Sequence, residues 1–163
     1  MKVKNLKGAI VLPAGSGKTT LSKKYKNLYD IDSFHTPQDR DILRKLYQEV
    51  KISQDWDKYN RVEMTLIQDK INNLETPFIL LLHSKEKADL LNIPYLGAGK
   101  TSKSIMERVA LQRGEKDTLR GQMTYDNWIY TESPIFNSHE DIHKHILNLA
   151  NKNDIYLQPY IED

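Results

Sequence analysis

Residues 10–21 read Ile-Val-Leu-Pro-Ala-Gly-Ser-Gly-Lys-Thr-Thr-Leu, and this stretch decides the fold. The apolar run before Pro13 predicts a buried strand, and Gly15 and Gly17 allow the following backbone to turn its N–H groups toward an anion. The helical pattern that comes next would place the positive end of a helix at the same point. A strand, a glycine-rich turn and a helix in this order are typical of a phosphate-binding loop.

The side chains of this loop extend the prediction from an anion to a nucleotide with its metal. Lys18 can reach the β- and γ-phosphates, and the Thr19 hydroxyl can bind Mg²⁺. The residues predicted to bind the phosphates are Ala14, Gly15, Ser16, Gly17, Lys18, Thr19 and Thr20. Leu12 stands where the strict pattern G-x-x-x-x-G-K-[ST] has its first glycine, so the match is weakened, but the order of elements still favours phosphate binding.

The composition limits what the chain can be. Its 163 residues suffice to bury a core, and we expect a single domain over residues 1–163. No cysteine is present, which excludes disulfides, cysteine–zinc sites and thiol catalysis. The net charge of +2 does not favour nucleic acid as a partner. Without a membrane-spanning run or signal peptide, we expect a cytoplasmic protein with no membrane partner, and the Lys, Asn, Ile and Tyr usage would suit a phage or virus.

Hydrophobic periodicity predicts strands that alternate with helices. Strands are expected at residues 8–12, 28–34 and 78–82, with weaker candidates at 93–96 and 134–137. Helices are expected after the loop with Leu21, Tyr25 and Leu28 inward, from Thr36 to Val50, at residues 54–74, 85–91, 101–113 and 116–130, and from Ser138 onward. The run at 78–82 is apolar on both faces, as in a parallel sheet covered by helices. The pattern therefore predicts an α/β fold.

Two acids follow the second predicted strand. Asp30 and Asp32 would share a strand face by their spacing, and Asp32 lies nearer the carboxyl end, where open α/β sheets bind ligands. Asp32 is therefore predicted to ligate Mg²⁺ or to accept the proton of an acceptor hydroxyl. Asp30 is equally well explained as a solvated strand end.

Two histidines stand near these acids. His35 follows Asp32 closely and could contact a substrate, although a loop histidine is more often solvated. The strand at residues 78–82 ends in His83, where many phosphate-loop ATPases carry an acid. This departure shifts the expected metal ligands to Asp32 and Thr19.

Arginines are expected wherever negative charge spreads over a transferred phosphoryl group. Arg108, Arg113 and Arg120 lie in one helical region interrupted by Gly114, and a two-helix flap at about residues 100–130 could close over the phosphates. The alternative is a solvated helix face on which the arginines pair with nearby acids. We predict at least one catalytic arginine, with Arg113 as the first candidate and Arg120 as the second.

Two further motifs imitate functional sites. Residues 97–102, Gly-Ala-Gly-Lys-Thr-Ser, repeat the end of the loop, but Pro94 interrupts the segment before them, so we assign the nucleotide to the first loop and leave the second as an alternative anion site. His139-Glu-Asp-Ile-His143 matches the zinc signature H-E-x-x-H, yet it lacks an obvious third ligand and borders the core stripe of the last helix. Zinc chemistry is therefore not expected.

The chain resembles the small phosphate-loop kinases: the nucleoside monophosphate kinases and the related shikimate and gluconate kinases. The resemblance rests on residues 13–20, on Asp30-Ile31-Asp32 and on the arginine-bearing lid region, and only the first of these is specific. It implies a three-layer P-loop NTPase fold, with a five-stranded parallel sheet in the order 2-3-1-4-5, helices on both faces and a short lid. It also implies ATP and Mg²⁺ as cofactors, with Lys18 on the transferred phosphate and Thr19 on the metal.

These patterns together predict an ATP-dependent phosphotransferase that moves the γ-phosphate to a small acceptor, in first place a nucleoside monophosphate or nucleoside. A kinase of 5′-hydroxyl polynucleotides is an alternative that the mild net charge does not favour. A second alternative is a nucleotide-binding module that lacks catalysis. The departures at Leu12 and His83 leave nucleotide binding better predicted than catalysis.

Overall fold

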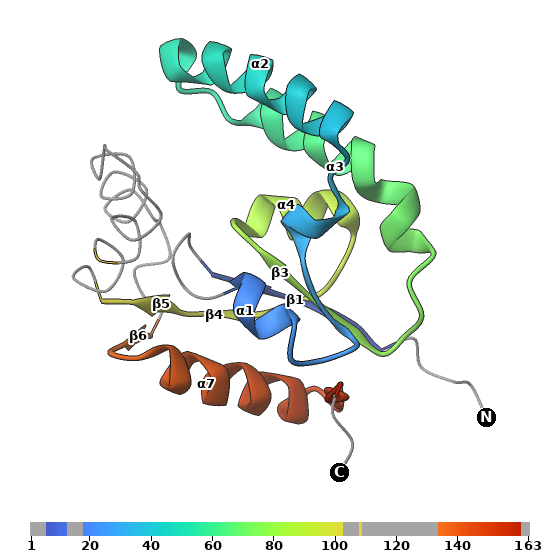
Figure 1. Cartoon of the computed structure of the whole chain (residues 1–163), viewed down its shortest axis with the longest axis vertical. Helices are drawn as coiled ribbons and strands as arrows, with labels where there is room; N and C mark the ends of the chain where they lie inside the picture. Colours follow the sequence, from blue (N-terminus) through green and yellow to red (C-terminus); the bar gives the residue numbers. More distant parts are fainter. Residues whose placement is uncertain (1–5, 13–17, 103–107, 109–133, 161–163) are drawn as a thin grey trace.

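The computed structural model describes residues 6–12, 18–102, 108 and 134–160, and a parallel sheet forms its centre (Figure 1). The strands are β1 (Lys7–Val11), β2 (Leu28–Asp30), β3 (Phe78–Leu82) and β4 (Tyr95–Ala98). Their spatial order is β2-β3-β1-β4, and each neighbouring pair is parallel. The predicted α/β fold with a parallel sheet is confirmed.

Helices cover the sheet on both faces. They are α1 (Lys18–Ser22), α2 (Pro37–Ser53), α3 (Asp57–Asn72), α4 (Lys85–Leu91) and α7 (His139–Lys152), and a short 3₁₀ helix, η1 (Ile31–Phe34), follows β2. Figure 1 shows α3 and α4 on one side of the sheet and α7 on the other, with the α2–α3 pair projecting beyond the sheet. No helix within the described ranges has the length and apolar character needed to cross a membrane.

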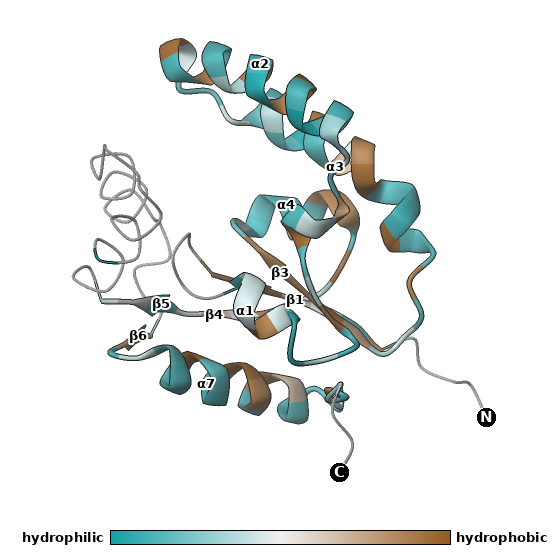
Figure 2. Cartoon of the chain, viewed as in Figure 1, coloured by the Kyte–Doolittle hydropathy of each residue, from teal (hydrophilic) through white to brown (hydrophobic). Residues whose placement is uncertain are grey.

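The core consists of two layers separated by the sheet. Leu80 and Leu82 of β3 face α3 and α4, whereas Ile79 and Leu81 face α7, because successive side chains of a strand point to opposite sides. All residues of β3 are buried, and the central strands and the inner stripe of α7 form the apolar interior in Figure 2. Burial on both faces explains why this run is continuously apolar.

The sheet differs from the predicted five strands, because four strands make up the central sheet in the described part of the chain. A last strand does occur near the predicted place, as β6 (Ile135–Phe136), but it pairs with β5 (Lys100–Thr101) in a separate two-stranded sheet. Pairing with β1 extends one residue past β4, since the Gly99 N–H donates to the Val11 carbonyl at 3.1 Å, and the chain then enters the separate pair. The five-stranded order 2-3-1-4-5 is therefore not confirmed.

The same strands correct the interpretation of residues 97–102. Gly97 and Ala98 belong to β4, and Lys100 begins β5, so this segment is extended and does not curl around an anion. Gly97 has a φ of +157°, a conformation that side chains rarely adopt, and the Leu149 side chain packs against its Cα. The glycines of this motif serve strand packing.

Two boundaries near the site also differ from the prediction. Helix α1 ends at Ser22, so Tyr25 and Leu28 do not continue its inner stripe, and Leu28 instead pairs with Ile79 in the sheet. Strand β2 ends at Asp30 because the Asp30 carboxylate accepts the Asp32 N–H at 3.2 Å and begins η1. Asp32 is therefore on a helical turn and does not share a strand face with Asp30.

Candidate phosphoryl-transfer site

The predicted site lies where β1, β2 and β3 end at the same edge of the sheet. The parallel pairing continues one residue past β1, since the Leu12 N–H donates to the Leu82 carbonyl at 2.9 Å. Lys18 starts α1 and is buried, with 6% of its surface exposed, whereas Thr20 faces solvent on the same turn. The start of α1 thus meets the carboxyl edge of the sheet, where ligands of such folds bind.

Thr19 and Asp30 are in direct contact at this edge. The Thr19 hydroxyl donates to Asp30 Oδ2 at 2.8 Å, and Asp30 is buried, with 4% of its surface exposed. A hydroxyl and a carboxylate are hard oxygen donors of the kind that Mg²⁺ prefers, so this pair fits the metal that a bound nucleotide would bring. Sequence reasoning ranked Asp32 above Asp30 for that role, but Asp30 is the acid that reaches Thr19.

Asp32 faces two histidines. Its Oδ2 lies 3.6 Å from His83 Nε2, and its Oδ1 lies 4.0 Å from His35 Nδ1. About half of the side chain is exposed (51%), yet burial raises the pKa of the carboxyl above its usual value, and the charge of Asp30 raises it further. Lys18 and Lys87 partly oppose this rise. A carboxylate with a raised pKa is better suited to accept a proton.

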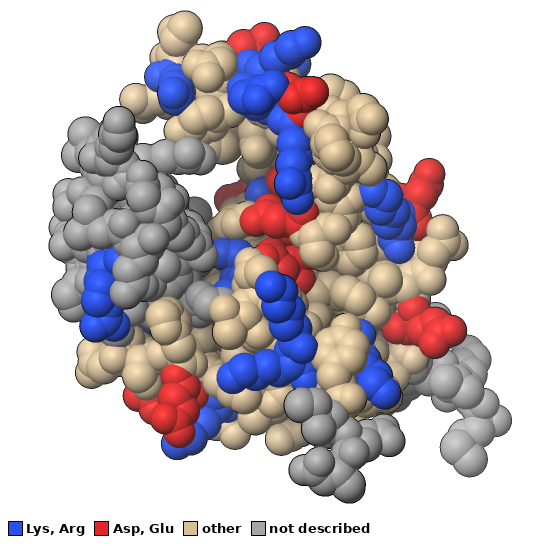
Figure 3. Space-filling model, viewed as in Figure 1, with Lys and Arg blue, Asp and Glu red and all other residues tan. Residues whose placement is uncertain are grey.

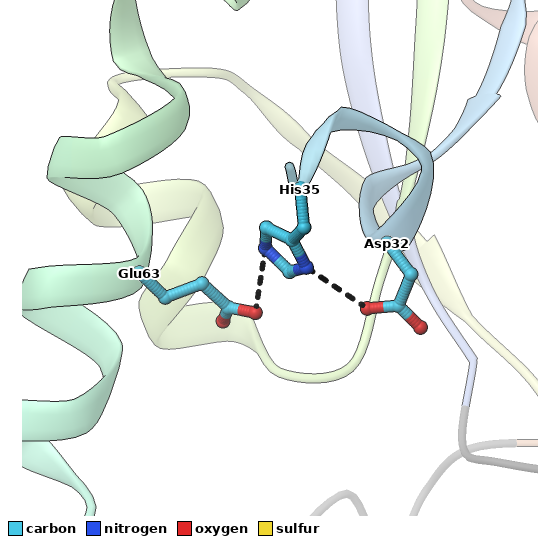
Figure 4. Close-up of side chains that lie close together, drawn as sticks. All are labelled: Asp32, His35 and Glu63. Atoms are coloured by element: carbon cyan, nitrogen blue, oxygen red, sulfur yellow. Dashed lines mark ion pairs between the residues drawn. The ribbon is translucent and has the colours of Figure 1, made fainter. Parts of the chain in front are cut away.

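A buried charged cluster lies behind Asp32, and sequence reasoning missed most of it. His35 Nε2 lies 3.1 Å from Glu63 Oε2 (Figure 4). Lys87 Nζ lies 2.5 Å from Glu63 Oε1. Burial of Glu63 raises the pKa of its carboxyl, but contacts with His35 and Lys87 outweigh burial and hold the pKa below its usual value. His35, for which the sequence left a substrate contact and a solvated loop position open, has only 6% of its side chain exposed.

One signal in the sequence could have indicated Glu63. The buried stripe of α3 contains Asn60, Glu63, Met64, Ile67 and Ile71. Glu63 therefore occupies a position whose helical spacing from the apolar residues places it on the inner face. The hydrophobic spacing alone predicts an inner face made of Tyr59, Val62, Leu66, Ile67, Ile71 and Leu74, which is correct at Ile67 and Ile71 and omits Glu63. A charge on the inner face of a helix implies a partner in the interior.

An open cleft of about 590 Å³ runs beside this acidic edge. Its lining includes Thr19, Asp30, Asp32, Arg40 and Tyr160. Arg40 comes from α2 and Tyr160 from the C-terminal segment, so the cleft combines acids, a guanidinium and an aromatic ring. Figure 3 shows side chains of both charges gathered along the middle of this face, below α2.

Several predicted site residues lie outside the described residues: Ala14, Gly15, Ser16, Gly17, Arg113 and Arg120. Their roles stay predictions. Arg108 is described and exposed.

In the zinc-like motif at residues 139–143 of α7, His143 contacts a tyrosine side chain. His143 Nε2 lies 2.5 Å from the Tyr25 hydroxyl, and the two rings meet edge to face. Burial lowers the pKa of His143, and the positive charge of Lys24 lowers it further. This histidine therefore joins α7 to the segment after α1.

The chain is similar to known proteins in its structure but not in its sequence. No protein-family model matches the chain, and no curated protein matches its sequence. Shikimate kinase from Bacteroides thetaiotaomicron matches its structure with a TM-score of 0.54 at 15% identity, over 90% of this chain and 98% of that one. A gluconokinase from Sinorhizobium meliloti 1021 matches with a TM-score of 0.53 at 15% identity, over 94% of this chain and 96% of that one.

This chain has the fold of these two kinases. The resemblance to the small phosphate-loop kinases is thereby confirmed for the fold, and at this identity the likeness extends no further. Neither match supports the phage or viral origin suggested by the composition.

Proposed function

We propose that the chain is an ATP-dependent kinase that transfers the γ-phosphate to a small acceptor. The observation that carries the proposal is the 2.8 Å hydrogen bond from the Thr19 hydroxyl to Asp30, directly after the predicted phosphate-binding loop. This contact gives the loop the hydroxyl–carboxylate pair that the Mg²⁺ of a bound nucleotide needs. The kinase fold supports the same class of reaction.

The residues divide into a nucleotide side and an acceptor side. On the nucleotide side, Lys18 binds the transferred phosphate, and Thr19 with Asp30 holds Mg²⁺, which neutralises phosphate charge when bound. On the acceptor side, Asp32 accepts the proton of the attacking hydroxyl, because its raised pKa suits a base and its carboxylate lies beside His83 at the open cleft. This division replaces the expected role of Asp32 as a metal ligand.

The proposal also includes the other residues predicted from the sequence. The remaining phosphate-binding residues are Ala14, Gly15, Ser16 and Gly17 of the loop, together with Thr20 at the start of α1. Arg113 and Arg120 of the lid region stabilise the charge of the transferred group. All of these parts belong to one kinase domain over residues 1–163.

We propose a nucleoside monophosphate or nucleoside as the acceptor. The cleft beside Asp32 supports this class, since the Arg40 guanidinium can pair with a phosphate and the Tyr160 ring offers a flat face to a base. The two solved kinases of this fold are a shikimate kinase and a gluconokinase, so carboxylate acceptors are the competing class.

A transfer assay with ATP labelled at the γ-phosphate tests the proposal. The panel contains nucleosides, nucleoside monophosphates, shikimate, gluconate and 5′-hydroxyl oligonucleotides. We expect label in a nucleotide product, with a kcat of about 1–100 s⁻¹ as is usual for kinases. Label in the oligonucleotide alone would show a polynucleotide kinase, and ATP binding without transfer to any compound would contradict a kinase.

A further inference from the structure

The nucleotide side proposed above does not use the charged cluster behind Asp32. We propose that Glu63 and His35 are positioning residues, which together with Lys87 and His83 hold the Asp32 carboxylate in one orientation toward the acceptor. This inference rests on the proposed function, because Asp32 needs a fixed orientation only if it accepts a proton from a bound hydroxyl.

The imidazole of His35 stands between two carboxylates in Figure 4. Its Nδ1 lies 4.0 Å from Asp32 Oδ1, and its Nε2 lies 3.1 Å from Glu63 Oε2. The two nitrogens of an imidazole point away from each other, so each carboxylate faces its own nitrogen. The acid at Nε2 holds the ring plane in place, and with it the direction in which Nδ1 points toward Asp32.

A second path reaches the other oxygen of Asp32. Lys87 Nζ lies 2.5 Å from Glu63 Oε1 and 3.5 Å from His83 Nδ1, and His83 Nε2 lies 3.6 Å from Asp32 Oδ2. The contacts therefore close a ring: Asp32, His35, Glu63, Lys87, His83 and back to Asp32. Since the ring meets both oxygens of Asp32, it restrains rotation of the carboxylate from two sides.

Burial shows that the ring runs from the interior to the site. The side chains of His35, Glu63 and Lys87 are 6%, 3% and 7% exposed, whereas the Asp32 side chain is 51% exposed. Buried ionisable groups are costly unless they are paired, and well-packed apolar residues usually stabilise a core at least as well. Stability alone therefore does not account for this set, whereas orientation of an exposed reacting carboxylate does.

Metal binding is the competing explanation of the same cluster. Asp32, His35 and Glu63 each offer a ligand atom, and these atoms lie within 4.8 Å of one another. The Lys87 ammonium, however, already neutralises Glu63, and the His35 nitrogens diverge toward different acids. The geometry suits a chain of contacts better than three ligands that converge on one ion.

Steady-state kinetics with the best acceptor of the panel test whether this ring of contacts positions Asp32. We expect His35→Ala and Glu63→Gln to lower kcat by about 10- to 100-fold, with the KM for ATP unchanged within about twofold, since residues that orient a reacting group have effects of this size. His35→Asn restores part of kcat, because its amide can still contact Asp32. The matched control is His145→Ala on α7, whose ring contacts the Ala98 carbonyl at 3.0 Å and which should keep kcat.

A second measurement is independent of turnover. In protein labelled with ¹³C at the aspartate carboxyl carbons, Glu63→Gln should shift the Asp32 signal and leave the signal of Asp141 in place, because Asp141 lies at the start of α7 on the other face of the sheet. An unshifted Asp32 signal, or a folded His35→Ala variant with full kcat, overturns the proposal that the ring positions Asp32. Stoichiometric zinc or manganese in the purified protein that His35→Ala loses also overturns it. Failure of the wild type to transfer phosphate contradicts the proposed kinase activity. The ¹³C shift of Asp32 then decides separately whether the ring positions this carboxylate.

Discussion

Asp30 and Asp32 stand two positions apart, yet their side chains meet different neighbours. Asp30 is buried against the Thr19 hydroxyl, and its second oxygen accepts the Asp32 N–H at 3.2 Å. Asp32 turns toward His83 and His35 instead. One turn of 3₁₀ helix after β2 thus separates the proposed metal side from the proposed acceptor side.

This separation predicts different defects for the two acids. Asp30→Asn should raise the Mg²⁺ concentration required for half-maximal activity, because a charged metal ligand is lost. Asp32→Asn should lower kcat by at least about 100-fold with an unchanged Mg²⁺ requirement, because a proton acceptor is lost. Magnesium titrations of the transfer rate measure both effects.

Thr19 supplies the matched pair of controls. Thr19→Val should reproduce the Mg²⁺ defect of Asp30→Asn, whereas Thr19→Ser keeps the hydroxyl and should behave as the wild type. Equal Mg²⁺ requirements for Asp30→Asn and the wild type would contradict the assignment of Asp30 to the metal.

His143 makes stability depend on pH. Its folded pKa lies below the ordinary value of 6.5, because burial and Lys24 disfavour the charged ring. The unfolded chain therefore binds more protons, and the free energy of unfolding falls as the pH drops below 6.5. Urea unfolding at several pH values between 7.5 and 5 should show this fall, and His143→Gln should reduce it. An identical pH dependence for the two proteins would refute the role of His143.

At the scale of elements, α2 has a well-formed N-terminus. The Thr36 hydroxyl accepts the Asp39 N–H at 3.1 Å, and the Asp39 carboxylate accepts the Thr36 N–H at 3.0 Å. Thr36→Ala should lower the free energy of unfolding by about 1 kcal/mol, as for other lost helix caps. Thr36→Ser should keep most of it, and chemical denaturation compares the three proteins. A Thr36→Ala variant as stable as the wild type would contradict the cap.

Elements with strong local signals were predictable from the sequence. The apolar run of β3, the capped start of α2 and the bounds of α4 are confirmed because each depends on nearby residues. The end of β2 was not predictable, since it depends on the Asp30 side chain turning back to the Asp32 N–H. The separation of β5 and β6 from the central sheet likewise depends on contacts between segments far apart in the sequence.

The residues of the candidate site likewise include some that a local motif predicts and others that only the fold brings together. Lys18 and Thr19 follow from a motif of consecutive residues. Glu63 and Lys87 come from different helices, and only the folded chain brings their side chains together. The expected inner face of α3 included Ile67 and Ile71 but omitted Glu63, because charged side chains are usually exposed.

At the scale of the whole molecule, the C-terminal segment completes the wall of the cleft. The Asn27 amide donates to the Tyr156 carbonyl at 2.8 Å and to the Pro77 carbonyl at 3.1 Å, and its oxygen accepts the Gln158 N–H at 2.8 Å. Ile155 and Leu157 are buried in the core on the α7 side. One buried side chain thus ties the end of the chain to the start of β2.

Loss of the Asn27 hydrogen bonds should destabilise the protein and make the C-terminal segment more mobile. Asn27→Ala leaves three backbone groups without their partner, so we expect the free energy of unfolding to fall by about 1–3 kcal/mol. Cleavage within residues 155–160 by a nonspecific protease should also become faster. Asn153→Ala, which removes a single hydrogen bond to the Leu149 carbonyl, is the control and should have a smaller effect. Equal losses would contradict the account of Asn27.

The central claim is that the start of α1 and the acidic sheet edge together transfer phosphate from ATP. The most direct test compares γ-phosphate transfer to the best acceptor by the wild type, Lys18→Ala and Lys152→Ala, whose lysine is exposed at the end of α7. The account predicts that Lys152→Ala matches the wild type and that Lys18→Ala loses about 100-fold or more in rate. Transfer by folded Lys18→Ala at the wild-type rate would contradict it.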